Sequence, residues 1–116
     1  MRMWSVPPEV MCRQHLLGEH VELHMLAGTI AAGKRLDGYL DNGLVEPANI
    51  HTRHDSLVVE MKRRGMRHQS PLPQPDVSAY RAGAIDPEAA LAALLGRCAR
   101  CAARAATGTT STPGVA

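Results

Sequence analysis

One short stretch of the sequence concentrates side chains that can exchange protons. Residues 15–24 include three histidines and two glutamates: His15, Glu19, His20, Glu22 and His24. On a helix, successive residues are about 100° apart, so His15, Glu19 and Glu22 fall on one face. His20 and His24 point the other way. Clustered titratable groups are typical of functional sites, although a single helix histidine is more often structural. The face with Glu22 is the first candidate site.

The spacing of His20 and His24 also invites comparison with zinc peptidases. In those enzymes two histidines four residues apart share a zinc ion, and a glutamate directly after the first histidine is the general base. Here Glu22 follows His20 by two positions, which turns its side chain toward the opposite side of the helix. The spacing therefore argues against a zinc peptidase.

The cysteines belong to two half-sites of a kind that binds zinc. Cys12 and His15 form a CxxH pair, and Cys98 and Cys101 form a CxxC pair. Brought together, the two pairs would make a Cys₃His zinc site. A CxxC on an alanine-rich helix is also typical of reduced, half-buried thiols, and a catalytic His15 would be unavailable as a ligand. Both interpretations stay open. The odd number of cysteines, 3, favours a reducing compartment over a disulfide framework.

The start of the chain offers a nucleophile of another type. Methionine aminopeptidases require a small second residue, and Arg2 is large, so we expect Met1 to persist and to carry the free α-amine. An unperturbed α-amine has a pKa of about 7.7 to 8.0, so a useful fraction is neutral at cellular pH. Met1 is therefore a candidate covalent nucleophile.

The elements that must position these groups are helices. Pro7 and Pro8 can open a helix, with Ser5 nearby as a possible cap, and Gly33 can end it. These signals predict a first helix over residues 8–32. Residues 34–46 contain turn-forming residues and predict a loop.

The second half of the chain contains two further helix signals. Pro47 opens a helix that Gly65 closes, and an apolar stripe follows its length: Ile50, Leu57, Val58 and Met61. Residues 69–75 cannot continue a helix and predict an extended connector, followed by irregular chain to residue 85. Asp86 then caps a third helix that has Pro87 at its first position.

Composition points the same way. The chain of 116 residues has no Phe, 1 Trp and 2 Tyr, so its core must come from aliphatic side chains and 6 Met, which suit helix packing. We predict an all-α fold, a single compact domain of three main helices with long connecting loops over residues 1–105. Residues 106–116 hold too little apolar material to order themselves and are expected to be a disordered tail.

Charge gives a weaker signal. The net charge is only +2, but four cations cluster at the end of the second predicted helix: Lys62, Arg63, Arg64 and Arg67. Such a group can contact phosphate, and it can equally be a solvated helix end.

The sequence shows neither a signal-peptide pattern nor a run of about 20 apolar residues. We therefore expect a soluble, cytoplasmic protein with no membrane contact.

In four segments the chain resembles the pyrimidine dimer DNA glycosylases, small phage-type enzymes that repair ultraviolet damage. The segments are residues 1–4 (MRMW), 14–23 (QHLLGEHVEL), 33–35 (GKR) and 57–65 (LVVEMKRRG). Together they span about the first two-thirds of the chain, and the most specific element is the spacing from the amine to His15 and Glu22.

The resemblance implies a mechanism and roles for particular residues. The α-amine of Met1 would attack C1′ of the damaged nucleotide and form an imine, and Glu22 would be the essential carboxylate. Arg2 and His15 match residues near the phosphate and sugar. The implied partner is double-stranded DNA containing a lesion, with no cofactor and no obligate protein partner. Phosphate contacts would come from Lys34, Arg35, Lys62, Arg63, Arg64 and Arg67.

The chain also departs from the family pattern near the proposed site. Val21 and Met25 stand where the family has arginines, His24 replaces a proline, and the aromatic-rich C-terminal tail is absent. The substrate therefore stays open among a pyrimidine dimer, another damaged base and an abasic site. Two other classes of protein also stay open: a non-catalytic nucleic-acid-binding module and a small zinc-binding protein organised by Cys12, Cys98 and Cys101.

Overall fold

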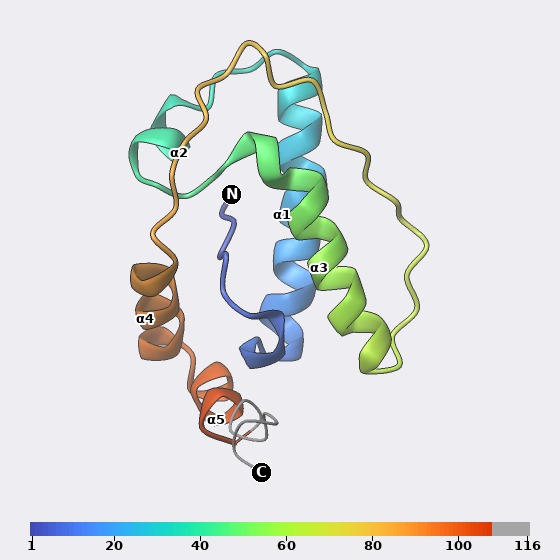
Figure 1. The fold of residues 1–116 in the computed structure, drawn as a ribbon, viewed down its shortest axis with the longest axis vertical. Coiled ribbons are helices and arrows are strands. Elements are labelled where there is room, and N and C mark those ends of the chain that lie inside the picture. Colours follow the sequence, from blue (N-terminus) through green and yellow to red (C-terminus); the bar gives the residue numbers. More distant parts are fainter. Residues whose placement is uncertain (108–116) are drawn as a thin grey trace.

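The structure is a computed structural model that describes residues 1–107. Over this range the chain is helical and contains no strand, which confirms the all-α prediction. The helices are α1 (Arg13–Ala31), α2 (Asp37–Asp41), α3 (Ile50–Arg63), α4 (Pro87–Arg97) and α5 (Ala99–Thr107), with 3-10 turns η1 (Pro8–Val10) and η2 (Pro47–Asn49). In Figure 1, α1 and α3 pack against each other, and α4 and α5 lie on the side of α1 that faces the N-terminal segment.

The first helix is shorter than predicted at its start. Pro8 opens only the turn η1, and α1 begins at Arg13 because Cys12 is its N-cap: the Cys12 sulfur accepts a hydrogen bond from the backbone N–H of His15. The prediction of a Ser5 cap and a start at Pro8 was therefore wrong. The end was correct, since Gly33 has a φ of 70° and its N–H donates to the carbonyl of Ile30.

The connection after α1 contains an element that the loop prediction missed. Residues Asp37–Asp41 form the short helix α2, which buries Leu40. The next helix, α3, begins at Ile50 after η2 rather than at Pro47. Its predicted apolar stripe is confirmed, because the structure buries Ile50, Leu57, Val58 and Met61.

The third predicted helix exists as two pieces. Asp86 caps α4 as expected, with its side chain accepting from the N–H groups of Glu88 and Ala89. The helix then breaks at Cys98, whose backbone is extended, and α5 starts at Ala99. The break lets α5 pack against η1. Because α5 runs to Thr107, the prediction of a disordered tail was wrong for residues 106 and 107, and its remaining residues, 108–116, lie outside the described residues.

Two ion pairs lock the helices around the core. The Arg53 guanidinium donates to both carboxylate oxygens of Glu19, at 2.7 and 2.8 Å, and to the carbonyl of Val6 at 2.7 Å. In the second pair, Arg64 Nε donates to one Glu60 oxygen within the end of α3, and the same guanidinium reaches back to the carbonyls of Pro8 and Met11. Glu19 and Arg53 therefore join α1, α3 and the N-terminal segment. Local sequence patterns had put Glu19 on the candidate face without a partner.

None of the helices within residues 1–107 combines the length and the apolarity that crossing a membrane requires.

Candidate active site

The N-terminal amine lies beside Glu22. The nitrogen of Met1 is 4.0 Å from the Glu22 Oε1 atom, and the backbone N–H of Arg2 donates to the same oxygen at 2.9 Å. The Met1 side chain is 11% exposed and the Glu22 side chain 35% exposed, so the carboxylate is reachable from solvent. An amine and a carboxylate at this separation can exchange a proton after a small movement or through one water molecule.

The segment that carries the amine runs antiparallel to α1 along one face. The Met1 sulfur accepts a weak hydrogen bond from the Thr29 hydroxyl at 4.0 Å, and the Trp4 ring meets the His15 ring edge-on at 6.0 Å between centroids. Thr29, Glu22 and His15 are spaced by seven residues, close to two helical turns, which places them on the same face. This face is the one that the sequence singled out.

Residues 3–6 anchor this segment in the core. Met3, Trp4 and Val6 are buried. The Met3 N–H donates to the carbonyl of Leu44 at 2.7 Å, and its sulfur accepts from the N–H of Glu46 at 3.3 Å. The amine is therefore held at the end of a fixed segment.

Positive charge gathers next to the amine. The Arg2 guanidinium stacks on the Trp4 ring at 3.8 Å, and the Arg97 guanidinium lies 5.6 Å from the same ring. Burial lowers the pKa of Arg2, Arg97 lowers it further, and Glu19 and Glu22 oppose that shift. The indole ring thus has two cations next to it, and one of them, Arg2, interacts electrostatically with Glu22. Sequence reasoning missed Arg97, because the position of α4 depends on contacts distant in sequence.

His15, which the resemblance puts near the phosphate and sugar, has its Nδ1 atom directed toward sulfur atoms. Its Nδ1 atom lies 3.3 Å from the Cys12 sulfur and 3.7 Å from the Cys101 sulfur. With Cys98 these residues form one cluster, whose potential ligand atoms all lie within 4.8 Å of one another. The two half-sites seen in the sequence are therefore adjacent in space. Burial raises the pKa of the Cys101 thiol to about 12, whereas the Cys101 N–H lowers the pKa of Cys98.

The basic group at the end of α3 separates into exposed and engaged side chains. Lys62 and Arg67 are exposed, and no side-chain partner is present for either among residues 1–107. Arg63 is 61% exposed while paired with Glu60. Arg64 is only 12% exposed, and its guanidinium is occupied by Glu60 and two carbonyls. The structure gives Arg64 a role in holding η1 to α3.

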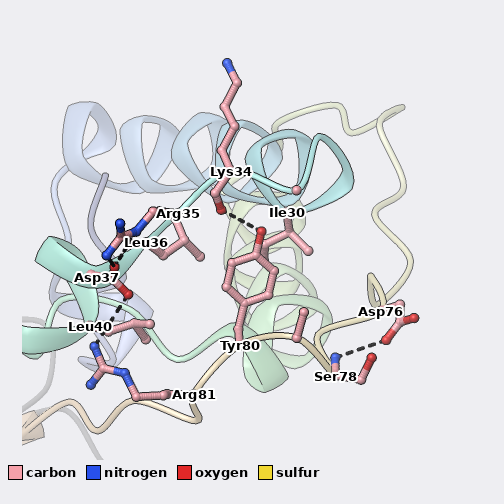
Figure 2. Close-up of a pocket in the computed structure, with 12 residues that line it drawn as sticks. Ile30, Lys34, Arg35, Leu36, Asp37, Leu40, Asp76, Ser78, Tyr80 and Arg81 are labelled. Atoms are coloured by element: carbon pink, nitrogen blue, oxygen red, sulfur yellow. Dashed lines mark hydrogen bonds and ion pairs between the residues drawn. The ribbon is translucent and has the colours of Figure 1, made fainter.

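Lys34 and Arg35 lie at the other end of the molecule, beyond the C-terminus of α1. They border a pocket of about 300 Å³ whose floor is the Tyr80 ring (Figure 2). The Tyr80 hydroxyl donates to the Lys34 carbonyl at 2.6 Å, and the Lys34 side chain extends away from the pocket. The Arg35 Nε group donates a hydrogen bond to the Asp37 carboxylate at 2.7 Å. Of the two, Lys34 keeps its charged group free of partners within the described chain.

Three exposed arginines that sequence reasoning missed adjoin the cysteine cluster. Arg13 follows Cys12, Arg97 precedes Cys98, and Arg100 precedes Cys101. Because the two half-sites meet, these three cations all adjoin the cluster in sequence, and Arg97 also lies 5.6 Å from the Trp4 ring on which Arg2 stacks. The signal was present in the sequence as basic residues adjacent to the two half-sites, but it became visible only once those half-sites were known to meet.

The histidines on the opposite face of α1 form a cluster of their own. His20, His24, His54 and His68 have neighbouring ring centroids 4.8 to 5.2 Å apart. The Nε2 atoms of His20 and His68 are 3.0 Å apart, so one of them donates to the other. Burial lowers the pKa of His20 to about 4, and the neighbouring histidines add to this shift. The sequence analysis correctly put His20 and His24 on a different face from Glu22. It did not predict that they meet His54 of α3 and His68, which follows α3.

Comparison with known proteins identifies a family for this chain. Residues 1–74 match the family model described as pyrimidine dimer DNA glycosylase. Neither the curated proteins nor the solved structures gave a match. The matched residues include the amine, Arg2, His15 and Glu22, together with all of α1 and α3. They cover well over half of the 116 residues, and the chain therefore belongs to the pyrimidine dimer DNA glycosylase family.

Proposed function

We propose that this protein is a DNA repair glycosylase with abasic-site lyase activity, which acts on damaged pyrimidines through an imine formed by the N-terminal amine. The observation that carries the proposal is the 4.0 Å separation between the Met1 nitrogen and Glu22 Oε1, at a partly exposed position. Membership of the family adds the substrate class, a pyrimidine dimer by the family's description.

The proposed chemistry uses groups of this chain alone. The neutral amine of Met1 attacks C1′, the bond from C1′ to the base breaks, and the base leaves with the bonding electrons. The sugar ring opens to leave an imine between the amine and C1′. Loss of a C2′ proton then expels the 3′ phosphate by β-elimination, and water later releases the sugar fragment.

Glu22 is proposed to serve both halves of this sequence. As a carboxylate it stabilises the positive charge that develops on the sugar, and it accepts or returns the protons that the amine and C2′ exchange. The Arg2 N–H, at 2.9 Å, keeps the carboxylate directed toward the amine. These two contacts support a catalytic role for Glu22 over the fully buried Glu19, which Arg53 neutralises.

DNA affinity is proposed to come from cations on both sides of the amine. Arg2 and Arg97 would meet the phosphates next to the lesion. Lys34, Arg35, Lys62, Arg63 and Arg67 would contact phosphates farther along the duplex, which makes binding strongly salt-dependent. We leave Arg64 out because its partners are within the protein. The Nδ1 atom of His15 is directed to sulfur, so any contact of His15 with the sugar would use Nε2.

The surface beside Glu22 suits an unstacked base. Val21 and Met25 are each 55% exposed, one turn apart on α1, on either side of Glu22 in sequence. Access to C1′ requires kinked DNA or an extruded nucleotide, and this costs least at damaged sites. An apolar surface of this kind can cover an extruded base or fill the gap that the base leaves.

Borohydride trapping tests the proposal. Reduction of the imine should link the wild-type protein covalently to abasic DNA, and peptide mapping should place the link on Met1. A protein acetylated at its N-terminus and the Glu22→Gln variant should both lose this product. The matched control is Glu88→Gln, which alters an exposed glutamate on α4 and should trap like wild type. A link to a lysine, or full trapping by the acetylated protein, would refute the amine mechanism.

The second candidate function is a non-catalytic DNA-binding module with the same fold. The surface cations at both ends of the molecule are compatible with it. Such a module would bind DNA with the same salt dependence but give no trapped product on any substrate. A panel of dimer-containing, oxidised and abasic duplexes distinguishes the two functions and identifies the lesion.

A further inference from the structure

We propose that Cys12, His15, Cys98 and Cys101 bind one Zn²⁺ ion in a closed, structural site. This inference goes beyond the proposed repair reaction and does not depend on it. The site would join the start of α1 to the start of α5.

The distances within the cluster fit a tetrahedral zinc site. With Zn–S bonds of about 2.3 Å and Zn–N bonds of about 2.0 Å, two sulfurs lie about 3.8 Å apart, and sulfur and nitrogen lie about 3.5 Å apart. The Cys12 and Cys98 sulfurs are 3.9 Å apart. The Nδ1 atom of His15 is 3.3 Å from the Cys12 sulfur and 3.7 Å from the Cys101 sulfur. The donors therefore already surround a space of the right size.

Each sulfur also receives a backbone N–H group. The Cys12 N–H donates to the Cys101 sulfur at 3.2 Å, the His15 N–H to the Cys12 sulfur at 3.5 Å, and the Cys101 N–H to the Cys98 sulfur at 3.4 Å. Such bonds orient the sulfurs and offset the negative charge of three thiolates, as outer partners of metal ligands do. Three neutral thiols would not need this arrangement.

The local backbone is shaped around the cluster. Cys12 caps α1, and Cys98 occupies the extended break before α5, so each half-site begins a helix. Helix N-termini stabilise thiolates. Apart from Gly96, residues 89–106 are mostly strong helix formers that would favour one continuous helix. The break at Cys98 is what allows both sulfurs of the CxxC pair to approach His15.

The donor set selects zinc and a structural role. Three sulfurs and one imidazole nitrogen in tetrahedral geometry are typical of structural zinc sites, and four protein ligands leave no position open for water or substrate. A disulfide is the competing fate of these cysteines. Its S–S bond is about 2.05 Å, which would require Cys12 and Cys98 to approach much more closely than they do.

Metal analysis of the intact, reduced protein tests this inference. Elemental analysis after gel filtration should give one zinc per chain, and a thiol-modifying reagent should release it to a colorimetric chelator. Replacement by Co²⁺ should give the strong visible bands of a tetrahedral thiolate site. Neither measurement uses DNA, so zinc can be absent while trapping succeeds, and trapping can fail while zinc is present.

Two variants identify the ligands. Cys98→Ser should lose at least tenfold in zinc affinity, and Cys98→His should restore binding with a weaker cobalt–thiolate band, because it replaces one ligand type with another. The matched control is His68→Gln, which alters the separate histidine cluster and should keep a full zinc content. If Cys98→Ser does not fold, the Cys98→His variant and Co²⁺ titration of the metal-free wild-type protein provide the same test.

Three outcomes would overturn the proposal. One is reduced wild-type protein with only background zinc and no cobalt–thiolate band on titration. Another is a native mass lower by two hydrogens with no metal, which indicates a disulfide. The third is zinc that survives in Cys98→Ser but is lost in His68→Gln, which would assign the metal to the histidines.

Discussion

Two clusters share one face of α1 and differ in how completely their polar atoms are satisfied. Around Glu22, the amine is 4.0 Å away and the carboxylate is 35% exposed, so both groups can still change partners. Around His15, three sulfurs and a ring nitrogen converge, and each sulfur already has an N–H donor. The comparison teaches that exposure and incomplete pairing, more than residue type, separate a place where bonds can be exchanged from a place that holds the chain together.

The strongest test of this comparison is Glu22→Gln. The amide has the same shape but cannot act as a base or a counter-charge, so strand cleavage should fall by about 10²- to 10⁴-fold. The fold should survive, because Glu22 is only partly buried. Single-turnover cleavage of abasic DNA measures the first effect and thermal unfolding the second. Wild-type cleavage rates would remove Glu22 from the reaction.

Glu19 offers the reverse test, since it lies one turn from Glu22 and is fully paired. Arg53→Ala would leave the Glu19 carboxylate buried without its partner and should reduce the free energy of unfolding by about 3 to 5 kcal/mol. Urea denaturation measures this loss, and Arg13→Ala, at an exposed position, serves as the control. A stability loss equal to that of the control would show that the buried pair contributes nothing.

Arg64 and Lys62 sharpen the comparison at the end of α3. Arg64→Ala should cost about 1.5 to 3 kcal/mol of stability, because Glu60 and two carbonyls lose a charged donor. Lys62→Ala should leave stability unchanged and reduce the slope of log affinity against log salt by about one. Salt titrations of DNA binding and denaturation curves separate the two effects. If instead Arg64→Ala reduced the salt slope and Lys62→Ala reduced stability, Arg64 would be the residue that contacts DNA and Lys62 the residue that stabilises the fold.

The smallest expected effect concerns acid and the histidine cluster. In the folded protein the pKa of His20 is about 4, below its ordinary value of 6.5, because of burial and of His54, His24 and His68. The unfolded chain therefore binds the proton more readily, and stability should fall as the pH drops from 6.5 toward 4. The hydrogen bond with His54 lowers the pKa of Asp55, so any stability that this pair contributes is lost at still lower pH. Unfolding at several pH values should show less of this decline in His20→Gln than in wild type.

Local signals in the sequence predicted much of the fold. Gly33, the stripe on α3 and the Asp86 cap act within a few residues, so each could be recognised without the structure. The same holds for the amine and Glu22, because their spacing matches a family pattern.

What the sequence did not predict depends on contacts between distant residues. Glu19 and Arg53 are 34 positions apart, and neither shows in its own neighbourhood that it will be neutralised by the other. Cys12 changed the start of α1 by acting as a cap, and Cys98 divided the last helix. The Cys12 cap is local, but a cysteine is not a usual capping residue, so the sequence did not indicate it. The approach of Cys98 to Cys12 joins half-sites 86 positions apart, which remained an open alternative.

The contact between Cys12 and Cys101 also bears on how the protein is made. These residues are 89 positions apart, and both belong to the same buried core as Trp4 and Met11. During synthesis the beginning of the chain leaves the ribosome first, but this part of its core cannot close until the last quarter has emerged. The part of the core around Cys12 therefore reaches its final packing only after residues near Cys101 are available, and until then a chaperone would find apolar side chains there.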